Sequence, residues 1–214
     1  MNDPRRPRIH VLAGVNGAGK SSIGGATVRR EGGDYFNPDE AARAIKARAS
    51  PLTQADANSE AWHQGVRLLK RAIMERLDFT FDTTLGGCTI TRLLIHAAQQ
   101  RIELHIWYVG LSTLALHIER VQARVSRGGH DIPERDIRRR YEQSRLNLIA
   151  LLPYLTTLRL YDNSTEADPT AGRPPTLKPV LYMERCRILG PPDLAATPHW
   201  AKPIVAAALK LHQS

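Results

Sequence analysis

Residues 14–21 read GVNGAGKS and place two glycines, a lysine and a serine at the spacing G-x-x-x-x-G-K-S. This spacing predicts a loop whose backbone N–H groups surround phosphate oxygens at the start of a helix. Lys20 would then reach the β- and γ-phosphates of ATP, and Ser21 would ligate Mg²⁺. An apolar run at 8–14 and a helical pattern at 19–30 favour this over a glycine turn that merely precedes a lysine. The residues predicted to hold the nucleotide are Gly14, Asn16, Gly17, Ala18, Gly19, Lys20, Ser21 and Ser22.

Two acidic residues follow short apolar runs. Asp39 stands in FNPDEAAR at the end of a predicted strand, 34–39, and Asp82 stands in FTFDTTLGG within another, 78–85. Ligands of open α/β sheets bind beyond the carboxyl ends of the strands, so both carboxylates are expected near the phosphate loop. Asp39 fits a general base for an attacking hydroxyl, and it equally fits the N-cap of the next helix. Asp82, with Thr83 and Thr84, fits a Mg²⁺ or substrate-hydroxyl site, or a strand-end turn.

Arginines gather over about 117–145. On the first predicted helix, Arg120, Arg124 and Arg127 recur at i, i+4 and i+7, away from its apolar stripe. After the residues GGH, a second helix adds Arg138, Arg139 and Arg140. Stacked cations repel one another, and an anion bound across them offsets this repulsion. The segment therefore predicts a lid that closes over transferring phosphates, with a solvated basic face as the alternative.

The apolar pattern alternates between strands and helices. Strands are predicted at 8–14, 34–39, 78–85, 102–110, 157–164 and 180–189. Helices are predicted at 19–30, 61–77, 91–101, from Ser112, at 131–152 with an Asp131 and Glu134 capping box, and at 203–213. Loops are expected at 50–60 and 167–179. Asp162 and Asn163, in the predicted strand 157–164, are expected near the adenine of the bound nucleotide. This order predicts an α/β fold with three layers, a central mostly parallel sheet and a helical, arginine-bearing lid.

Composition narrows the class of protein. A chain of 214 residues with 42% hydrophobic content suits one domain, 1–214. Two cysteines, Cys88 and Cys186, form no disulfide framework, and no signal peptide or membrane span is recognised, so a cytoplasmic protein without a membrane partner is expected. The net charge of +9 comes from 24 arginines against six lysines. Guanidinium groups bind phosphate oxygens bidentately, which predicts nucleotides, phosphorylated metabolites or nucleic acid as partners.

Four blocks together resemble the zeta-toxin family of P-loop kinases: GVNGAGKSS, YFNPDEAAR, FDTTLGG and RGGHDIPERDIRRRY, over roughly residues 9–150. The resemblance implies a nucleoside-kinase-like fold and ATP-dependent phosphorylation of a small-molecule hydroxyl. UDP-N-acetylglucosamine is the acceptor in the toxins that define the group, and an antitoxin is a partner. By position, Asp39 matches the catalytic acid, Asp82 and Thr84 match the contacts to the sugar nucleotide, and Arg120, Arg124, Arg127 and Arg139 match the arginines at the γ-phosphate. Asp82 replaces the usual glutamate, which leaves the acceptor open.

Two functions fit these residues. A small-molecule kinase uses the phosphate loop, a base and arginines together. A nucleotide-switched ATPase acting on nucleic acid would use the basic helices as its footprint. Only 6% of the residues are aromatic and none interrupts the arginines of the first helix, which disfavours base stacking. The sequence therefore predicts a kinase for a small acceptor, a nucleotide sugar being one candidate.

Overall fold

The protein is described by a computed structural model that covers residues 6–20, 35–48, 51–129, 131–165 and 177–213. Within these residues a sheet runs in the strand order β2-β1-β3-β4-β5-β6. The strands are β1 (Arg8–Ala13), β2 (Phe79–Thr83), β3 (Glu103–Gly110), β4 (Thr157–Asp162), β5 (Lys178–Glu184) and β6 (Arg187–Gly190). The first four are parallel to one another, and β5 and β6 join antiparallel. The predicted α/β fold with a mostly parallel sheet is confirmed.

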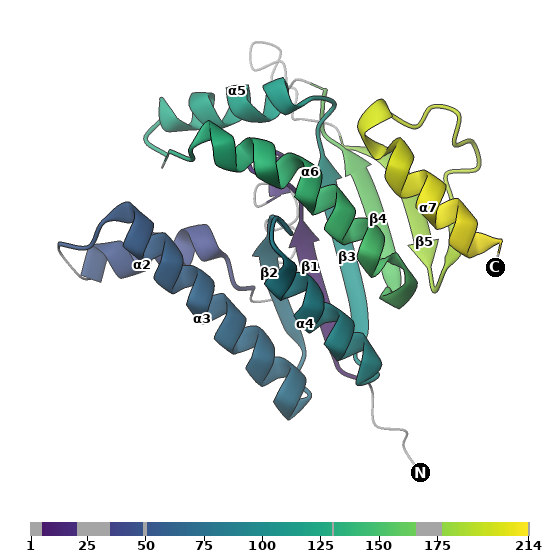
Figure 1. Ribbon diagram of the computed structural model, residues 1–214, viewed down its shortest axis with the longest axis horizontal. Helices are drawn as coiled ribbons and strands as arrows, with labels where there is room; N and C mark the ends of the chain where they lie inside the picture. Colours follow the sequence, from purple (N-terminus) through teal and green to yellow (C-terminus); the bar gives the residue numbers. More distant parts are fainter. Residues whose placement is uncertain (1–5, 21–34, 49–50, 130, 166–176, 214) are drawn as a thin grey trace.

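Helices cover one face of the sheet and its carboxyl edge (Figure 1). They are α2 (Pro38–Arg48), α3 (Gln54–Glu75), α4 (Cys88–Gln99), α5 (Leu114–Val125), α6 (Glu134–Leu151) and α7 (Lys202–His212). Figure 1 shows α5 beyond the arrowheads of the parallel strands, while α2 and α3 stand beside β2. The helix predicted at 19–30 lies almost wholly outside the described residues. None of the described helices is long and apolar enough to cross a membrane.

The main core lies between the sheet and these helices. Ile9 and Val11 of β1 are buried between the half-buried Arg8 and His10, and the strand ends in Leu12 and Ala13, which are buried too. Ile9 and Val11 pack in one cluster with side chains from α3, α4, α6 and α7, such as Leu69, Leu94 and Leu148. This packing holds β1 centrally, so the loop that follows Ala13 starts from a rigid strand.

Several predicted boundaries were wrong for local reasons. Helix α3 begins at Gln54, inside the predicted loop 50–60, because Thr53 caps it by accepting a hydrogen bond from the Asp56 N–H at 3.1 Å. The predicted strand 34–39 is reduced, among its described residues, to a bridge between Phe36 and Phe81. The Asp131 capping box does not form, since Pro133 is the N-cap of α6 and no side chain caps it.

The predicted strand 180–189 is a hairpin. Arg185 and Cys186 make its turn with φ values of 43° and 65°. No glycine or asparagine marks this left-handed turn, so the sequence carries no ordinary signal for it. The antiparallel pair β5–β6 therefore extends a sheet that is otherwise parallel.

Candidate active site

A cavity of about 880 Å³ opens at the carboxyl ends of β1 and β2. Its walls come from the phosphate loop, from α2 and α3, from the loop after β2, and from α5 and α6. The predicted site residues among its lining are Asn16, Gly17, Gly19, Lys20, Asp39, Asp82, Thr83, Thr84, Arg120 and Arg124. The fold therefore gathers residues from four separate stretches of sequence around one space.

The phosphate loop has the backbone that its glycines predict. Gly14, Gly17 and Gly19 have φ values of 139°, 82° and 86°. A Cβ on Gly14 would lie 2.2 Å from the Val109 carbonyl oxygen. Only glycine fits that position, because the loop bends back against β3. Such a backbone suits a cradle for phosphate oxygens; Gly14 and Ala18 shape it without lining the cavity, and Ser21 and Ser22 lie outside the described residues.

Lys20 and Asp82 form an ion pair in the lining of the cavity. Lys20 Nζ lies 3.6 Å from Asp82 Oδ1, and each side chain is 9% exposed. The described residues include no group of three or more His, Cys, Asp and Glu side chains that could hold a metal alone. A Mg²⁺ here fits one buried carboxylate with phosphate and water oxygens completing its coordination, which is how this ion usually binds beside nucleotides.

Thr83 and Thr84 shape the loop after β2. The Thr83 hydroxyl accepts a hydrogen bond from the Leu85 N–H at 3.1 Å, and the Thr84 hydroxyl accepts one from the Gly86 N–H at 3.3 Å. Both residues also line the cavity. The hydroxyl groups of both threonines therefore stabilise a strand-end turn, which was one of the two predicted roles. Both residues can still contact a ligand, because they lie on the cavity wall.

Asp39 is not the cap of α2. The Asn37 side-chain oxygen accepts hydrogen bonds from the N–H groups of Asp39 at 2.9 Å and Glu40 at 3.3 Å, so Asn37 caps the helix. The Asp39 carboxylate lies on the cavity wall, and its Oδ2 is 3.7 Å from Arg124 Nη1. Of the two roles that the sequence left open, helix cap and general base, the cap is taken by Asn37. The position of the Asp39 carboxylate suits a group that acts on a ligand.

The arginines divide between cavity and solvent. Arg120 and Arg124 of α5 line the cavity, whereas Arg127 is exposed past the end of the helix. Arg139 does not line it either, and its Nη2 pairs with Asp136 Oδ1 at 3.2 Å. The structure brings Arg140 there instead.

Arg140 belongs to the predicted lid, but Arg139 and not Arg140 was matched to the γ-phosphate from sequence. Its Nη1 donates a hydrogen bond to Asn16 Oδ1 at 2.8 Å, and burial lowers the pKa of its guanidinium. The helical repeat is the signal that could have pointed to Arg140. Arg140 lies three residues after Ile137 and four before Ser144, so it shares a helix face with these two buried residues. His130 lies outside the described residues.

Asn163 contacts the phosphate loop, whereas Asp162 contacts Trp200. The Trp200 indole Nε1 donates to Asp162 Oδ2 at 2.6 Å, and the Asn163 amide donates to the Ala18 carbonyl at 2.9 Å. Neither residue lines the large cavity. These hydrogen bonds hold the two side chains in the fold, and their place beside the adenine stays a prediction.

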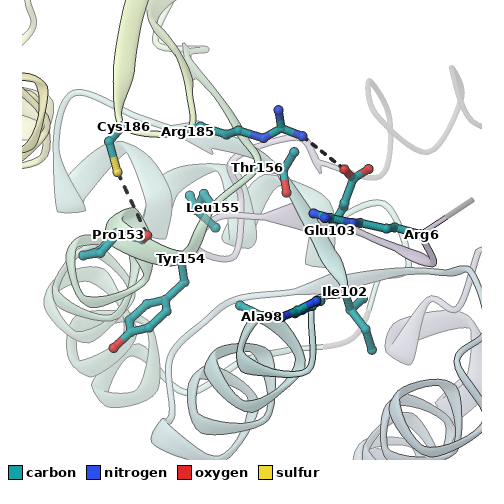
Figure 2. A pocket seen from close by; sticks show the side chains of 11 residues that line it. Arg6, Ala98, Ile102, Glu103, Pro153, Tyr154, Leu155, Thr156, Arg185 and Cys186 are labelled. Carbon is teal, nitrogen blue, oxygen red and sulfur yellow. Dashed lines mark hydrogen bonds and ion pairs between the residues drawn. The ribbon is translucent and has the colours of Figure 1, made fainter. Parts of the chain in front are cut away.

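A smaller hollow of about 310 Å³ lies at the other end of the sheet, where β3 begins. Figure 2 shows Arg185 reaching the Glu103 carboxylate, at 3.2 Å, and Cys186 beside Pro153. None of the residues predicted to do chemistry lines this hollow. The candidate site is therefore the large cavity at the carboxyl edge.

Comparison with known proteins agrees with this fold. An uncharacterised protein of Haemophilus influenzae is 27% identical over 133 residues, which are 60% of this chain and 88% of that protein. The crystal structure of AvrRxo1-ORF1:-ORF2 with ATP has a chain similar in fold, with a TM-score of 0.66 and 15% identity. The match covers 96% of this chain but 64% of that one, so this chain spans less than two thirds of its length.

A second solved structure has a related fold. A putative kinase from Chloroflexus aurantiacus aligns with a TM-score of 0.51 and 10% identity, over 63% of this chain and 75% of that one. The model of the family described as Zeta toxin matches residues 1–152, which include the predicted phosphate loop, Asp39, Asp82 and the predicted arginines. Since this match spans well over half of the sequence, the chain belongs to the zeta toxin family, and its membership supports a kinase-like phosphotransferase.

Proposed function

We propose that the protein transfers the γ-phosphate of ATP to a hydroxyl group of a small acceptor. The observation that carries the proposal is the meeting of Asp39 and Arg124, 3.7 Å apart, in the cavity that also contains Lys20. A carboxylate, a guanidinium and a phosphate loop at one point are the parts that phosphoryl transfer requires. A protein that only bound nucleotide would need no such carboxylate on the cavity wall.

Asp39 acts as the general base in this proposal. The acceptor oxygen forms a bond to the γ-phosphorus, and the bond from that phosphorus to the β–γ bridging oxygen breaks. The acceptor proton passes to the Asp39 carboxylate, and ADP leaves with the bridging oxygen. Positioning by the cavity walls supplies much of the rate, since this reaction needs little covalent help from the protein.

Cations around the cavity neutralise the charge that moves during transfer. Lys20 contacts the β- and γ-phosphates, while Arg120, Arg124 and Arg140 approach from the α5 and α6 side. Asp82, with Ser21 as the sequence predicts, would hold Mg²⁺. When bound, this ion neutralises phosphate charge and orients the γ-phosphate.

The far wall of the cavity leaves room for the acceptor. Asn58, Ser59 and Trp62 of α3 line it, and Trp62 is 43% exposed. Polar groups beside an aromatic face suit a sugar or a nucleoside. A UDP-N-acetyl sugar, implied by the family resemblance, is the acceptor to test first.

A protein inhibitor belongs to the same proposal. AvrRxo1-ORF1, which shares the fold, is crystallised together with AvrRxo1-ORF2. By analogy, we propose that this chain also has a protein partner, an antitoxin. Co-purification from cells that express a neighbouring reading frame tests this part separately.

The decisive experiment follows the label of γ-³²P-ATP with Mg²⁺ and a panel of nucleotide sugars, nucleosides and sugars. Label on one acceptor is expected, lowered about 10²- to 10⁴-fold by Asp39→Asn and abolished by Lys20→Ala. The matched control is Asp193→Asn, an exposed aspartate whose Oδ1 accepts from the Ala195 N–H at 2.7 Å, away from the cavity. Full transfer by Asp39→Asn would remove the base from the proposal, and label found only in free phosphate would favour the nucleotide-switched ATPase.

A further inference from the structure

Helices α5 and α6 are built around the phosphate loop. Val15, which is 2% exposed, packs in one apolar cluster with Val121 of α5, Ile132, and Ile137 of α6. A loop residue is thus part of the core that joins the two arginine-bearing helices. Moving these helices away from the loop would expose this cluster to water.

Asn16 adds polar contacts to both helices. Its carbonyl oxygen lies 2.8 Å from His117 Nδ1 of α5, and its side-chain oxygen accepts from Arg140 Nη1 of α6 at 2.8 Å. These partners are 101 and 124 residues away in sequence. One residue of the phosphate loop therefore ties two helices to the loop.

The state of the His117 imidazole suits a hydrogen bond to the Asn16 carbonyl oxygen at physiological pH. The side chain is 1% exposed, and burial lowers the pKa of the imidazole to about 4, so the ring is neutral at physiological pH. A carbonyl oxygen can only accept, and Nδ1 must therefore carry the hydrogen. The Tyr141 ring of α6 packs against the imidazole in a T-shaped arrangement, with 5.5 Å between the ring centroids.

Two glycines allow this close approach. A Cβ on Gly17 would lie 2.7 Å from the His117 carbonyl oxygen, so loop and helix meet backbone to backbone. A Cβ on Gly86 would lie 2.6 Å from Arg140 Cγ. The loop after β2 thus leaves the space through which Arg140 reaches Asn16.

We propose that His117 is a positioning residue that fixes the phosphate loop to α5 and α6 through Asn16. Arg120, Arg124 and Arg140 then stand at the phosphate site before the nucleotide binds, instead of arriving there by closure of a lid. This inference rests on the proposed nucleotide site and replaces the moving lid that the sequence suggested. It does not depend on which acceptor receives the phosphate.

Nucleotide binding tests the proposal without an acceptor. ATP affinity is measured by calorimetry for the wild type, His117→Leu and His117→Asn, with a melting curve for each. His117→Leu removes the donor and should weaken ATP binding about tenfold, the size of one lost buried hydrogen bond. Asparagine carries an N–H group where histidine has Nδ1, so His117→Asn should recover most of the affinity even though its melting temperature stays low.

The matched control is His105→Leu. His105 is also partly buried and hydrogen bonded, with its Nδ1 at 2.9 Å from the Thr157 hydroxyl, but it lies on β3 away from the cavity. This variant should lose stability and keep the ATP affinity of the wild type. Equal ATP affinity in His117→Leu and His105→Leu would overturn the proposal.

A distance measurement tests whether the arginines are already in place. Spin labels are placed at Gln122 of α5 and Lys70 of α3, both exposed and each on a helix that lines the cavity, in a chain carrying Cys88→Ser and Cys186→Ser. The expected distance distribution is narrow and unchanged by ATP. A broad distribution that narrows on ATP addition would show a moving lid and refute the inference. Normal binding without transfer to any acceptor would instead refute only the proposed function.

Discussion

Replacing Gly17 with alanine is the sharpest test of how the phosphate loop is held. Gly17 has a φ of +82°, and the new Cβ would lie 2.7 Å from the His117 carbonyl oxygen and 3.4 Å from Arg120 Cβ. The nearest atom belongs to a backbone, so it cannot rotate away. Either the loop or the start of α5 must move, and the loop N–H groups then lose their alignment with phosphate oxygens.

The size of the effect follows from two separate costs. Alanine in a left-handed conformation costs about 1 kcal/mol relative to glycine. Misaligning one hydrogen bond to a charged phosphate costs about 1.5 to 3 kcal/mol, which weakens ATP binding about 10- to 100-fold. The first cost lowers stability, and the second appears only in binding.

Gly128→Ala separates these costs. Gly128 has a φ of +87°, and nothing lies within 4 Å of its would-be Cβ. This variant should lose about 1 kcal/mol of stability in urea unfolding and bind ATP like the wild type. Calorimetric titration with ATP compares the two variants directly. If Gly17→Ala binds ATP as tightly as Gly128→Ala, the close packing of loop and helix has no functional consequence and the reasoning fails.

Three other perturbations have defined outcomes. Trp200→Phe removes the indole donor at 2.6 Å from Asp162 and should lower the free energy of unfolding by about 1 to 3 kcal/mol, measured with urea; an unchanged midpoint would contradict this. Because burial lowers the pKa of His117 from 6.5 to about 4, the unfolded chain binds a proton first as the pH falls. Stability should therefore drop by about 3 kcal/mol between pH 6.5 and pH 4, and His117→Leu should flatten that slope. Arg140→Ala should weaken ATP binding about tenfold and Arg127→Ala less than twofold, so equal effects would show that the cavity does not separate the two arginines.

Local sequence was sufficient for the phosphate loop and the type of fold. The glycines at 14, 17 and 19 adopt positive φ values, as residues without a Cβ can do without strain. Alternating strand and helix patterns reproduce the mostly parallel sheet. The carboxyl ends of β1 and β2 then bring Lys20 and Asp82 together, as that topology requires.

Helix boundaries and caps were less predictable, because neighbouring residues compete for the same role. Asn37 and Asp39 can both cap a helix, and the structure uses Asn37. Thr53 starts α3 in a stretch that was predicted to be a loop, since Ala57 and Ala61 bury their small side chains in a cluster with Ala42 of α2. Such burial depends on a partner helix that local patterns do not reveal.

The sequence by itself predicted a phosphate loop and most of the stretches that line the cavity. Only the tertiary structure decided which arginines line the cavity. Arg140 lines it, whereas Arg127 and Arg139 do not. It also decided that Asn16 joins α5 to α6 through partners 101 and 124 residues distant. The physical reason is that the residues of a phosphate loop are consecutive in the sequence. The orientation of a helix instead depends on packing between segments that are far apart in the chain.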